Sequence, residues 1–379
     1  MKVSLPQDQL SRGLGIVGRG VASSARSTLP VTSNILLATD EHRLRLSATD
    51  LEIGINLWLP ATIEEEGATT VPARLFTELV NSLPNARVDL AQTDEAHTTA
   101  VSCARVKANV RGIDPDEFPL IPTVSEQPSA AVPADLLKSM IGEVVFAAAT
   151  DDTRPIFTGV LATFAGDTLT FAAADGFRLS VRSASLGQPT AGDFSVIIPA
   201  RTLSELGRIL PDGDELVEVT VTPNRSQVLF HTGTLDLISR LIEGQYVNYR
   251  QIIPQRYGTR AVVSTADWNK ATRIAGFFAR DSNNIVRLSL DPGEDGATGS
   301  LTIAANAADV GDNVNQIDAV IEGEALTVAF NVKYIGEVLN VIHSNQVALE
   351  LLGPAQPGVV KPLDGTDYLH VMMPMSIPR

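Results

Sequence analysis

The chain contains nearly the same helix-like segment more than once. The stretch VPARLFTELVNSLP ends at Pro84, and IPARTLSELGRILP ends at Pro211. When the two are aligned, a Pro-Ala-Arg start, a Glu-Leu pair and a Leu-Pro end coincide. A third, more divergent copy, NVKYIGEVLNVIH, runs from Asn331 to His343. This repeat limits the fold, because one structural unit must be used for each third of the chain.

The apolar residues of all three segments follow the i, i+3, i+4, i+7 spacing of one helix face. In the first copy this face consists of Phe76, Leu79, Val80 and Leu83. The equivalent positions in the other copies are Leu203, Leu206, Gly207, Leu210, Ile335, Val338, Leu339 and Ile342. Each segment is therefore predicted to be an amphipathic helix packed on a core.

Other features recur at the same spacing. Asp8, Asp135 and Asp267 stand where a first helix of each repeat is expected to begin, since a carboxylate there satisfies free backbone N–H groups and suits the helix dipole. Alternating apolar residues around a small-residue turn predict a strand pair in each repeat. These pairs are residues 44–55, 169–181 and 301–314. The order helix, strands, helix, strands is thus expected three times.

Each repeat has the size of a domain and is too long for a solenoid repeat of roughly 20–50 residues. Pro-rich segments at 120–133 and 252–263 separate the repeats. We expect three domains, at residues 1–124, 129–253 and 260–379. Each should be α+β, with two helices covered by antiparallel sheets.

The net charge of −15 argues at first against nucleic-acid binding, because phosphate neutralisation requires Lys and Arg. The predicted helices nevertheless carry a small net positive charge, so the acidic residues lie mainly in strands and loops. Arg74, Arg201 and Lys333 occupy the first turns of the aligned helices, where a cation opposes the helix dipole. One such cation is an ordinary solvated helix end. Three in register are explained by a shared anionic partner.

Several other classes of protein are disfavoured. Cys103 is the only cysteine, which rules out an intrachain disulfide and indicates a buried small hydrophobe. No apolar run reaches the roughly 18 residues of a membrane span, and the N-terminus turns polar before a signal-peptide core, so a cytoplasmic protein is expected. The five histidines form no metal-ligand spacing, and no nucleophile motif appears.

Two alternatives stay open. GLGIVG (13–18), with Asp40 downstream, matches a dinucleotide fingerprint and would imply an enzyme with a cofactor there. Its context is wrong, because QDQLSR reads as a helix start and separates the glycines from any strand. The other alternative is a triple-repeat binding protein that never closes a ring.

Seven motifs together resemble the bacterial DNA polymerase III beta subunit, the sliding clamp. They are ATDLEIGI (48–55), TTVPARLFTELVNSLP (69–84), AADGFRLSV (173–181), IIPARTLSELGRILP (197–211), LIEGQYVNYRQIIP (241–254), FNVKYIGEVLN (330–340) and VMMPM (371–375). They span the chain in family order. The resemblance implies a processivity factor without catalytic activity or cofactor. It also implies a head-to-tail homodimer that closes into a ring, with the helices facing duplex DNA and no base readout.

The resemblance further implies a pocket between the second and third domains that accepts short motifs. Its partners would be the polymerase III alpha subunit, the clamp loader and proteins such as repair polymerases, mismatch repair proteins and ligase. The matching positions are Phe157, Ala174, Gly176, Phe177, Arg178, Leu179, Val247, Ile252, Asn331, Tyr334, Val371, Met373, Pro374 and Met375. An apolar slot with a few polar anchors, and methionines that repack, suits varied peptides.

DNA-facing and subunit-contact positions are implied in the same way. The matching DNA-facing positions are Arg12, Arg26, Arg74, Arg201 and Arg208, and helix position alone adds Lys138, Lys270, Arg273 and Lys333. At the dimer interface, Leu75 and Leu79 are expected to meet Phe277 and Phe278 of the partner subunit. Adjacent phenylalanines in a helix point about 100° apart, so both cannot face one core.

The chain departs from the family pattern at the pocket. Phe177 replaces the His of many relatives, and Val247 and Gln251 replace the frequent Pro and Arg. The usual Met-Pro-Met-Arg-Leu ending is here MPMSIPR, with Ser376 in place of Arg and an extension to Arg379. We expect the pocket to persist with an altered motif preference.

Overall fold

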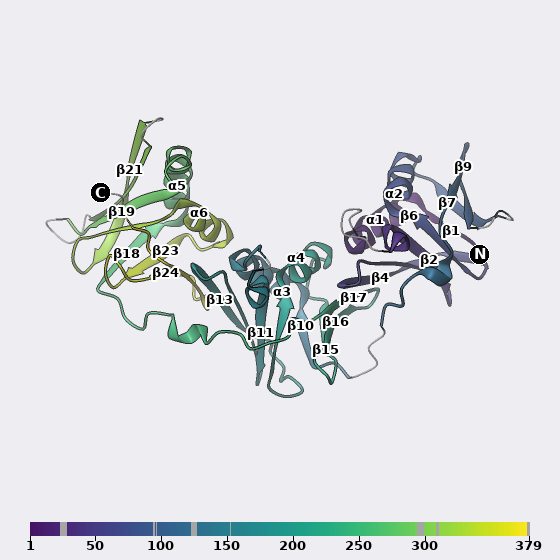
Figure 1. The fold of residues 1–379 in the computed structure, drawn as a ribbon, viewed down its shortest axis with the longest axis horizontal. Coiled ribbons are helices and arrows are strands. Elements are labelled where there is room, and N and C mark those ends of the chain that lie inside the picture. Colours follow the sequence, from purple (N-terminus) through teal and green to yellow (C-terminus); the bar gives the residue numbers. More distant parts are fainter. Residues whose placement is uncertain are drawn as a thin grey trace. The chain divides into compact units, whose positions relative to one another are not determined.

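The computed structural model describes residues 1–22, 29–93, 95, 97–122, 127–151, 153–293, 299–307 and 311–376. The chain divides into two compact units, whose main helices and strands are labelled in Figure 1. Unit 1 comprises Met1–Asp135 and Glu205–Leu241, and unit 2 comprises Leu136–Ser204 and Ile242–Arg379. The division passes through the central repeat, and the domain limits expected from the sequence remain a prediction.

The described residues contain six α-helices, two for each repeat. They are α1 (Gln7–Val17), α2 (Ala73–Ser82), α3 (Ala134–Val144), α4 (Ala200–Ile209), α5 (Thr265–Ala279) and α6 (Val332–Val341). The three aligned segments therefore form the predicted helices α2, α4 and α6. Each helix begins directly after a strand. The expected order was wrong in this respect, since every repeat opens with a strand and not with a helix.

The expected capping role of the aspartates is also corrected. α1 follows Pro6 without a side-chain cap, and Asp8 lies inside its first turn. At α5 the cap is Ser264, whose hydroxyl accepts a hydrogen bond from the backbone N–H of Asp267. Asp135 accepts a hydrogen bond from the N–H of Gly213 at 3.0 Å. The carboxylates in these first turns still favour the positive end of the helix dipole.

Unit 1 contains two antiparallel sheets. The first has the order β5 (Thr62–Glu65), β1 (Lys2–Pro6), β7 (Arg87–Gln92), β8 (Thr98–Cys103), β9 (Val106–Arg111). The second has the order β10 (Ala130–Pro133), β15 (Leu216–Val221), β16 (Gln227–Thr232), β17 (Leu235–Arg240), β4 (Ile53–Pro60), β3 (Arg43–Thr49), β2 (Asn34–Asp40), β6 (Ala68–Pro72). The β4–β17 pair, here called the first junction, joins strands of the first and second repeats.

Unit 2 contains one long antiparallel sheet. Its order is β14 (Phe194–Pro199), β11 (Gly159–Ala165), β12 (Thr168–Ala174), β13 (Arg178–Ser185), β25 (Tyr368–Met372), β24 (Gly358–Pro362), β23 (Gln346–Leu351), β18 (Thr259–Ser264), β21 (Gly311–Glu322), β20 (Gly299–Ala307), β19 (Ile285–Asp291), β22 (Leu326–Asn331). The β13–β25 pair, the second junction, joins the second and third repeats.

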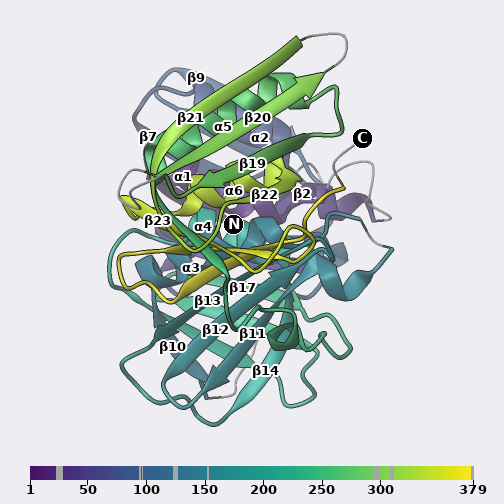
Figure 2. The same ribbon diagram turned by 90° about the vertical axis from the view of Figure 1, so that its left-hand side faces the viewer.

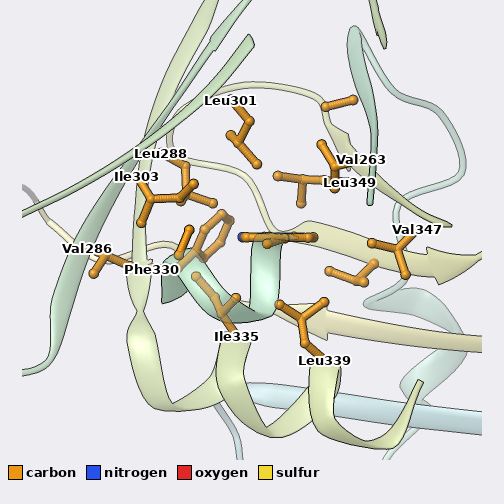
Figure 3. Close-up of a cluster of buried hydrophobic side chains, with 14 of the residues drawn as sticks. Val263, Val286, Leu288, Leu301, Ile303, Phe330, Ile335, Leu339, Val347 and Leu349 are labelled. Atoms are coloured by element: carbon orange, nitrogen blue, oxygen red, sulfur yellow. The ribbon is translucent and has the colours of Figure 1, made fainter. Parts of the chain in front are cut away.

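Helices and sheet enclose the hydrophobic core of the third repeat. Helix α5 lies behind β20 and β21 in Figure 2 and packs against both strands. Ile335 and Leu339 of α6 point into the cluster that holds Phe330 (Figure 3). Trp268 of α5 is fully buried in the same cluster. The i, i+4 pair on α6 therefore covers the core, as the helical spacing predicts.

Two sequence interpretations are settled by packing. Cys103 on β8 is buried, as predicted. Gly13 lies inside α1, and a Cβ there would come 2.7 Å from Cδ1 of Leu59. Because Gly13 lets the helix pack closely on β4 and does not form a strand-to-helix turn, the dinucleotide interpretation fails.

A buried polar cluster lies at the second junction. The Nδ1 atom of His370 is 2.7 Å from the hydroxyl of Ser180, which also contacts the hydroxyl of Tyr368. The ring of His370 stacks on Phe146 with centroids 5.4 Å apart. Burial, with a smaller contribution from the charge of Arg178, lowers the pKa of His370 to about 3. The imidazole is therefore neutral in the folded chain.

The neutral state of His370 predicts a pH-dependent stability. The unfolded histidine binds a proton near pH 6.5, whereas the folded one stays neutral until about pH 3. This stabilising contribution is complete above pH 6.5 and falls by about 1.4 kcal/mol per pH unit as pH decreases through that window. In urea unfolding over a pH series, His370→Phe should lose this slope relative to wild type. The exposed-site control His343→Phe should keep it, and equal slopes for the two variants would contradict the assignment.

Candidate partner pocket and nucleic-acid-facing helices

A tight turn between β12 and β13 forms one wall of the candidate partner pocket. The carboxylate oxygen Oδ1 of Asp175 accepts hydrogen bonds from the backbone N–H groups of Phe177 (2.8 Å) and Arg178 (3.0 Å). Gly176 adopts φ +95°, where a side chain is strained, and a Cβ there would lie 2.7 Å from Arg154. The turn holds the Phe177 side chain 59% exposed at the surface.

Arg178 connects this turn to other elements of unit 2. Its guanidinium pairs with Asp175 at 3.0 Å and with Glu337 of α6, and it donates to the carbonyl of Phe146 at 2.7 Å. It also lies 4.4 Å from the ring centroid of Tyr334, within cation–π range. Its side chain is only 9% exposed. Arg178 therefore holds the pocket together more than it offers a free charge to a ligand.

The loop that follows β17 forms a second wall. The hydroxyl of Tyr246 accepts a hydrogen bond from the N–H of Ala174 at 3.0 Å, and its ring packs edge-on against Phe157. Burial raises the pKa of Tyr246 to about 12, so the hydroxyl stays protonated. With Tyr246 anchored, Val247 and Ile252 of the same loop remain exposed.

The C-terminal segment and α6 complete the pocket. The N–H of Met373 donates to the carbonyl of Phe177 at 2.8 Å, and that of Met375 donates to Ala329 at 2.8 Å. Asn331 caps α6 by accepting from the N–H of Lys333. A groove of about 460 Å³ lies beside this tail. It is lined by Ala329, Pro354, Ala355, Pro374, Met375 and Ser376.

The structure thus gathers most of the expected pocket positions. Hydrogen bonds or ring contacts link Ala174, Phe177, Arg178, Tyr334, Met373 and, through Tyr246, Phe157. Leu179 and Val371 lie in the core cluster beneath them. The sequence patterns did not identify the supporting residues Asp175, Tyr246, Glu337, Phe146 and Arg154. Only Asp175 carried a signal, because Asp-Gly in AADGF is a turn dipeptide.

Cations gather in a groove between α5 and α6. The groove has a volume of about 550 Å³. Its charged lining residues are Lys270, Arg273, Arg280 and Lys333, and no carboxylate occurs among the described residues that line it. The third-repeat glutamate Glu337 pairs with Arg178, and the described residues show no ion pair for Lys333. Unbalanced positive charge in a groove attracts an anion.

The other expected DNA-facing cations differ in their surroundings. Arg12, Arg74, Arg201 and Arg208 are exposed on their helices, and Lys138 on α3 is partly buried. Arg74 pairs with Glu78 at 3.0 Å. Glu205, the equivalent glutamate on α4, pairs with Arg208 and Arg19, each at 2.9 Å. Arg26 lies outside the described residues.

The expected subunit-contact residues separate into two kinds. Leu75 on α2 is 55% exposed and Phe277 on α5 is 58% exposed. Leu79 is partly buried, and Phe278 packs against the core of the third repeat. Only the first pair is therefore free to contact another molecule without loss of its own packing.

Neither a metal-binding cluster nor a membrane-spanning helix occurs in the part of the chain that the structure describes. No group of three or more His, Cys, Asp or Glu side chains is arranged to hold a metal ion within these residues. In the same residues, no helix is both long and apolar enough to span a membrane.

Comparison with known proteins covers the whole chain. Residues 1–122, 131–248 and 250–376 match, in order, the N-terminal, central and C-terminal domains of the DNA polymerase III beta subunit. The beta sliding clamp of Bacillus subtilis is 32% identical over 99% of both chains, and that of Synechococcus elongatus is 34% identical over 100% of both. The crystal structure of the DNA polymerase sliding clamp from Bacillus subtilis superposes with a TM-score of 0.93 over 100% of both chains, at 31% identity.

The Asp175 turn generates a stability prediction. Asp175→Ala removes the acceptor for two backbone N–H groups and leaves the largely buried Arg178 without one partner. The free energy of unfolding should fall by about 1–3 kcal/mol. Asp175→Asn keeps an oxygen at the same place and should lose less. Urea unfolding of both variants measures the difference, and equal losses would show that the hydrogen bonds of the turn contribute little.

Proposed function

Because the chain belongs to the DNA polymerase III beta subunit family and is a sliding clamp that gives the replicative polymerase its processivity, we propose that it works as a head-to-tail homodimer closed into a ring around duplex DNA. Such a ring retains DNA by enclosing it. It therefore needs phosphate contacts without base recognition, so that it can slide. The protein is an accessory factor and catalyses no reaction.

The basic groove between α5 and α6 is the observation that carries the DNA-facing assignment. It offers Lys270, Arg273 and Lys333 on helix surfaces of a chain with net charge −15. Arg12, Arg26, Arg74, Lys138, Arg201 and Arg208 are proposed to extend the same surface. The acidic remainder of the chain would repel DNA elsewhere and confine it to the helices.

The exposed apolar residues Leu75 and Phe277 support a subunit interface between the first domain of one subunit and the third domain of the other. Leu79 and Phe278 are partly buried on the same two helices, and we propose that they contribute to this interface as well. Burial of such large side chains against a partner is the usual source of stability in a permanent dimer.

Two free strand edges support the same interface. β9 is the outer strand of its sheet, and β21 pairs with β18 only through Ala319–Glu322, so its earlier residues have one open edge. The exposed residues Lys107 and Arg111 on β9 are basic, and Asp312 and Asp318 on β21 are acidic. Antiparallel pairing of these edges between subunits would satisfy both backbones and match their charges.

The pocket in unit 2 is proposed to bind short motifs from clamp partners. The polymerase III alpha subunit, the clamp loader, repair polymerases, mismatch repair proteins and ligase are the candidates. The exposed Phe177, Val247, Ile252 and Met373 supply apolar contact over a rigid base, which suits peptide side chains of varied shape. We also propose domain limits of 1–124, 129–253 and 260–379, and action in the cytoplasm.

Charge reversal tests the DNA-facing groove. Lys270→Glu with Arg273→Glu should lower the magnitude of the slope of log affinity for duplex DNA against log salt by about 2 for each subunit, about 4 for the dimeric ring, since two phosphate contacts are lost per subunit. Arg74→Glu with Arg201→Glu should act less strongly, because Arg74 is already paired with Glu78. Arg287→Glu, an exposed strand residue of the third repeat, is the control. A salt slope unchanged by the first pair would refute the groove.

Substitution of the two exposed hydrophobics tests the ring. Leu75→Asp with Phe277→Asp should convert a particle of twice 40.3 kDa into a folded monomer, because aspartate cannot be buried at an apolar interface. Leu216→Asp, also at an exposed leucine, is the control. Small-angle X-ray scattering with calibrated mass gives the answer, and a double variant that remains dimeric would remove the interface.

A further inference from the structure

The turn that forms the partner pocket occurs a second time in the chain. At the first junction, Oδ1 of Asp50 accepts hydrogen bonds from the N–H groups of Glu52 (3.1 Å) and Ile53 (2.8 Å). Asp175 makes the same two bonds at the second junction. Leu51 adopts φ +76° at the position of Gly176, although a leucine rarely takes such an angle. The backbone of the pocket wall is thus retained at the first junction.

The strand pairing beside each turn is also the same. Gly54 pairs with Ile238 at the first junction, as Leu179 pairs with Val371 at the second. Two residues beyond each pair, the N–H of Arg240 donates to the carbonyl of Glu52 at 3.1 Å. At the second junction the N–H of Met373 donates to the carbonyl of Phe177 in the same manner. Glu52 and Arg240 therefore occupy the positions of Phe177 and Met373.

A small cavity of about 120 Å³ lies at this copy of the pocket. Its lining includes seven positions equivalent to pocket residues of the second junction. They are Thr49, Leu51, Glu52, Ile53, Gly54, Ile238 and Arg240. The remaining lining is Gln227 and the chain's own linker, Pro119–Pro122.

The linker fills the cavity at the first junction from one side. A Cβ on Gly54 would lie 2.8 Å from Cγ2 of Ile121, so the Ile121 side chain occupies the space above Gly54. At the second junction the equivalent residue, Leu179, has a side chain of its own. The neighbouring Leu120 is 96% exposed and takes no part in this contact. Through Ile121, the linker therefore supplies the apolar side chain that Gly54 lacks.

The outer rim of the first-junction cavity differs in chemistry from the rim of the partner pocket at the second junction. Glu52 and Arg240 form an exposed ion pair with a 3.7 Å contact, where the second junction presents the exposed apolar pair Phe177 and Met373. An apolar peptide side chain placed over this ion pair would have to desolvate it. The two junctions thus share a backbone framework and differ in what they admit.

We propose that the first junction is a second peptide-docking site whose resident ligand is the linker Pro119–Pro122. Ile121 is its anchor, and the Glu52–Arg240 ion pair keeps apolar peptides of clamp partners away. Each chain therefore offers partners one pocket, although it builds the framework of two. This inference rests on the proposed partner pocket for its template, and the linker contact can be tested without it.

Hydrogen exchange of the full chain tests the linker contact. Ile121→Gly should speed amide exchange in residues 49–54 and 238–240 at least tenfold, because the resident side chain is lost. Ile121→Val, which keeps a branched side chain over Gly54, is the matched control and should leave exchange there unchanged. Equal exchange in the two variants would overturn the resident-ligand part of the proposal.

Peptide stoichiometry tests the docking part. A synthetic peptide with the clamp-binding segment of the polymerase alpha subunit should bind wild type once per chain by titration calorimetry. The triple variant Glu52→Phe, Ile121→Gly, Arg240→Met should bind twice. One site per chain in a folded triple variant would overturn the second site. A wild type that binds no peptide would instead refute the proposed partner pocket, and the exchange experiment would then decide the linker contact alone.

Discussion

The rest of the structure depends on two antiparallel strand pairs that join different repeats, β4 with β17 and β13 with β25. Each repeat by itself would leave a strand edge with unpaired N–H and C=O groups, which is costly to expose and prone to association. Pairing these edges along the chain satisfies both and turns separate repeats into continuous sheets. It also places the turn that starts β13 beside the C-terminal segment, where the proposed partner pocket lies. The His370–Ser180–Tyr368 cluster is buried at this same pair.

Around the second junction the roles of polar and apolar residues are divided. Arg178, Asp175 and Tyr246 are largely buried, and they fix the turn, the loop and α6 relative to one another within unit 2. The exposed positions are apolar, as at Phe177 and Met373. A rigid polar base under an apolar surface suits the capture of short segments, because little ordering remains to be done when they bind.

The three repeats show how one helix position acquires different uses. Glu78 neutralises Arg74 on its own helix, Glu205 pairs with Arg208 and Arg19, and Glu337 is drawn to Arg178. The last arrangement leaves Lys333 to the groove between α5 and α6. The partner pocket and the basic groove thus share α6, and one carboxylate contributes to the character of both.

The threefold repeat, the six helices, the α+β class and the family could all be predicted from the sequence, because helical periodicity and local motifs are properties of neighbouring residues. The sequence also named most of the residues proposed for the partner pocket, since they lie in motifs, and that assignment stays a prediction. The sequence did not reveal that every repeat opens with a strand, or that Ser264 and not Asp267 caps α5. Nor did it reveal that Arg178 pairs with Asp175 and Glu337 and donates to the carbonyl of Phe146. These features became apparent only in the folded chain. They depend on which distant segments meet, as Glu337 meets Arg178 and Ile121 meets Gly54, and such meetings follow from strand register and close packing across the chain.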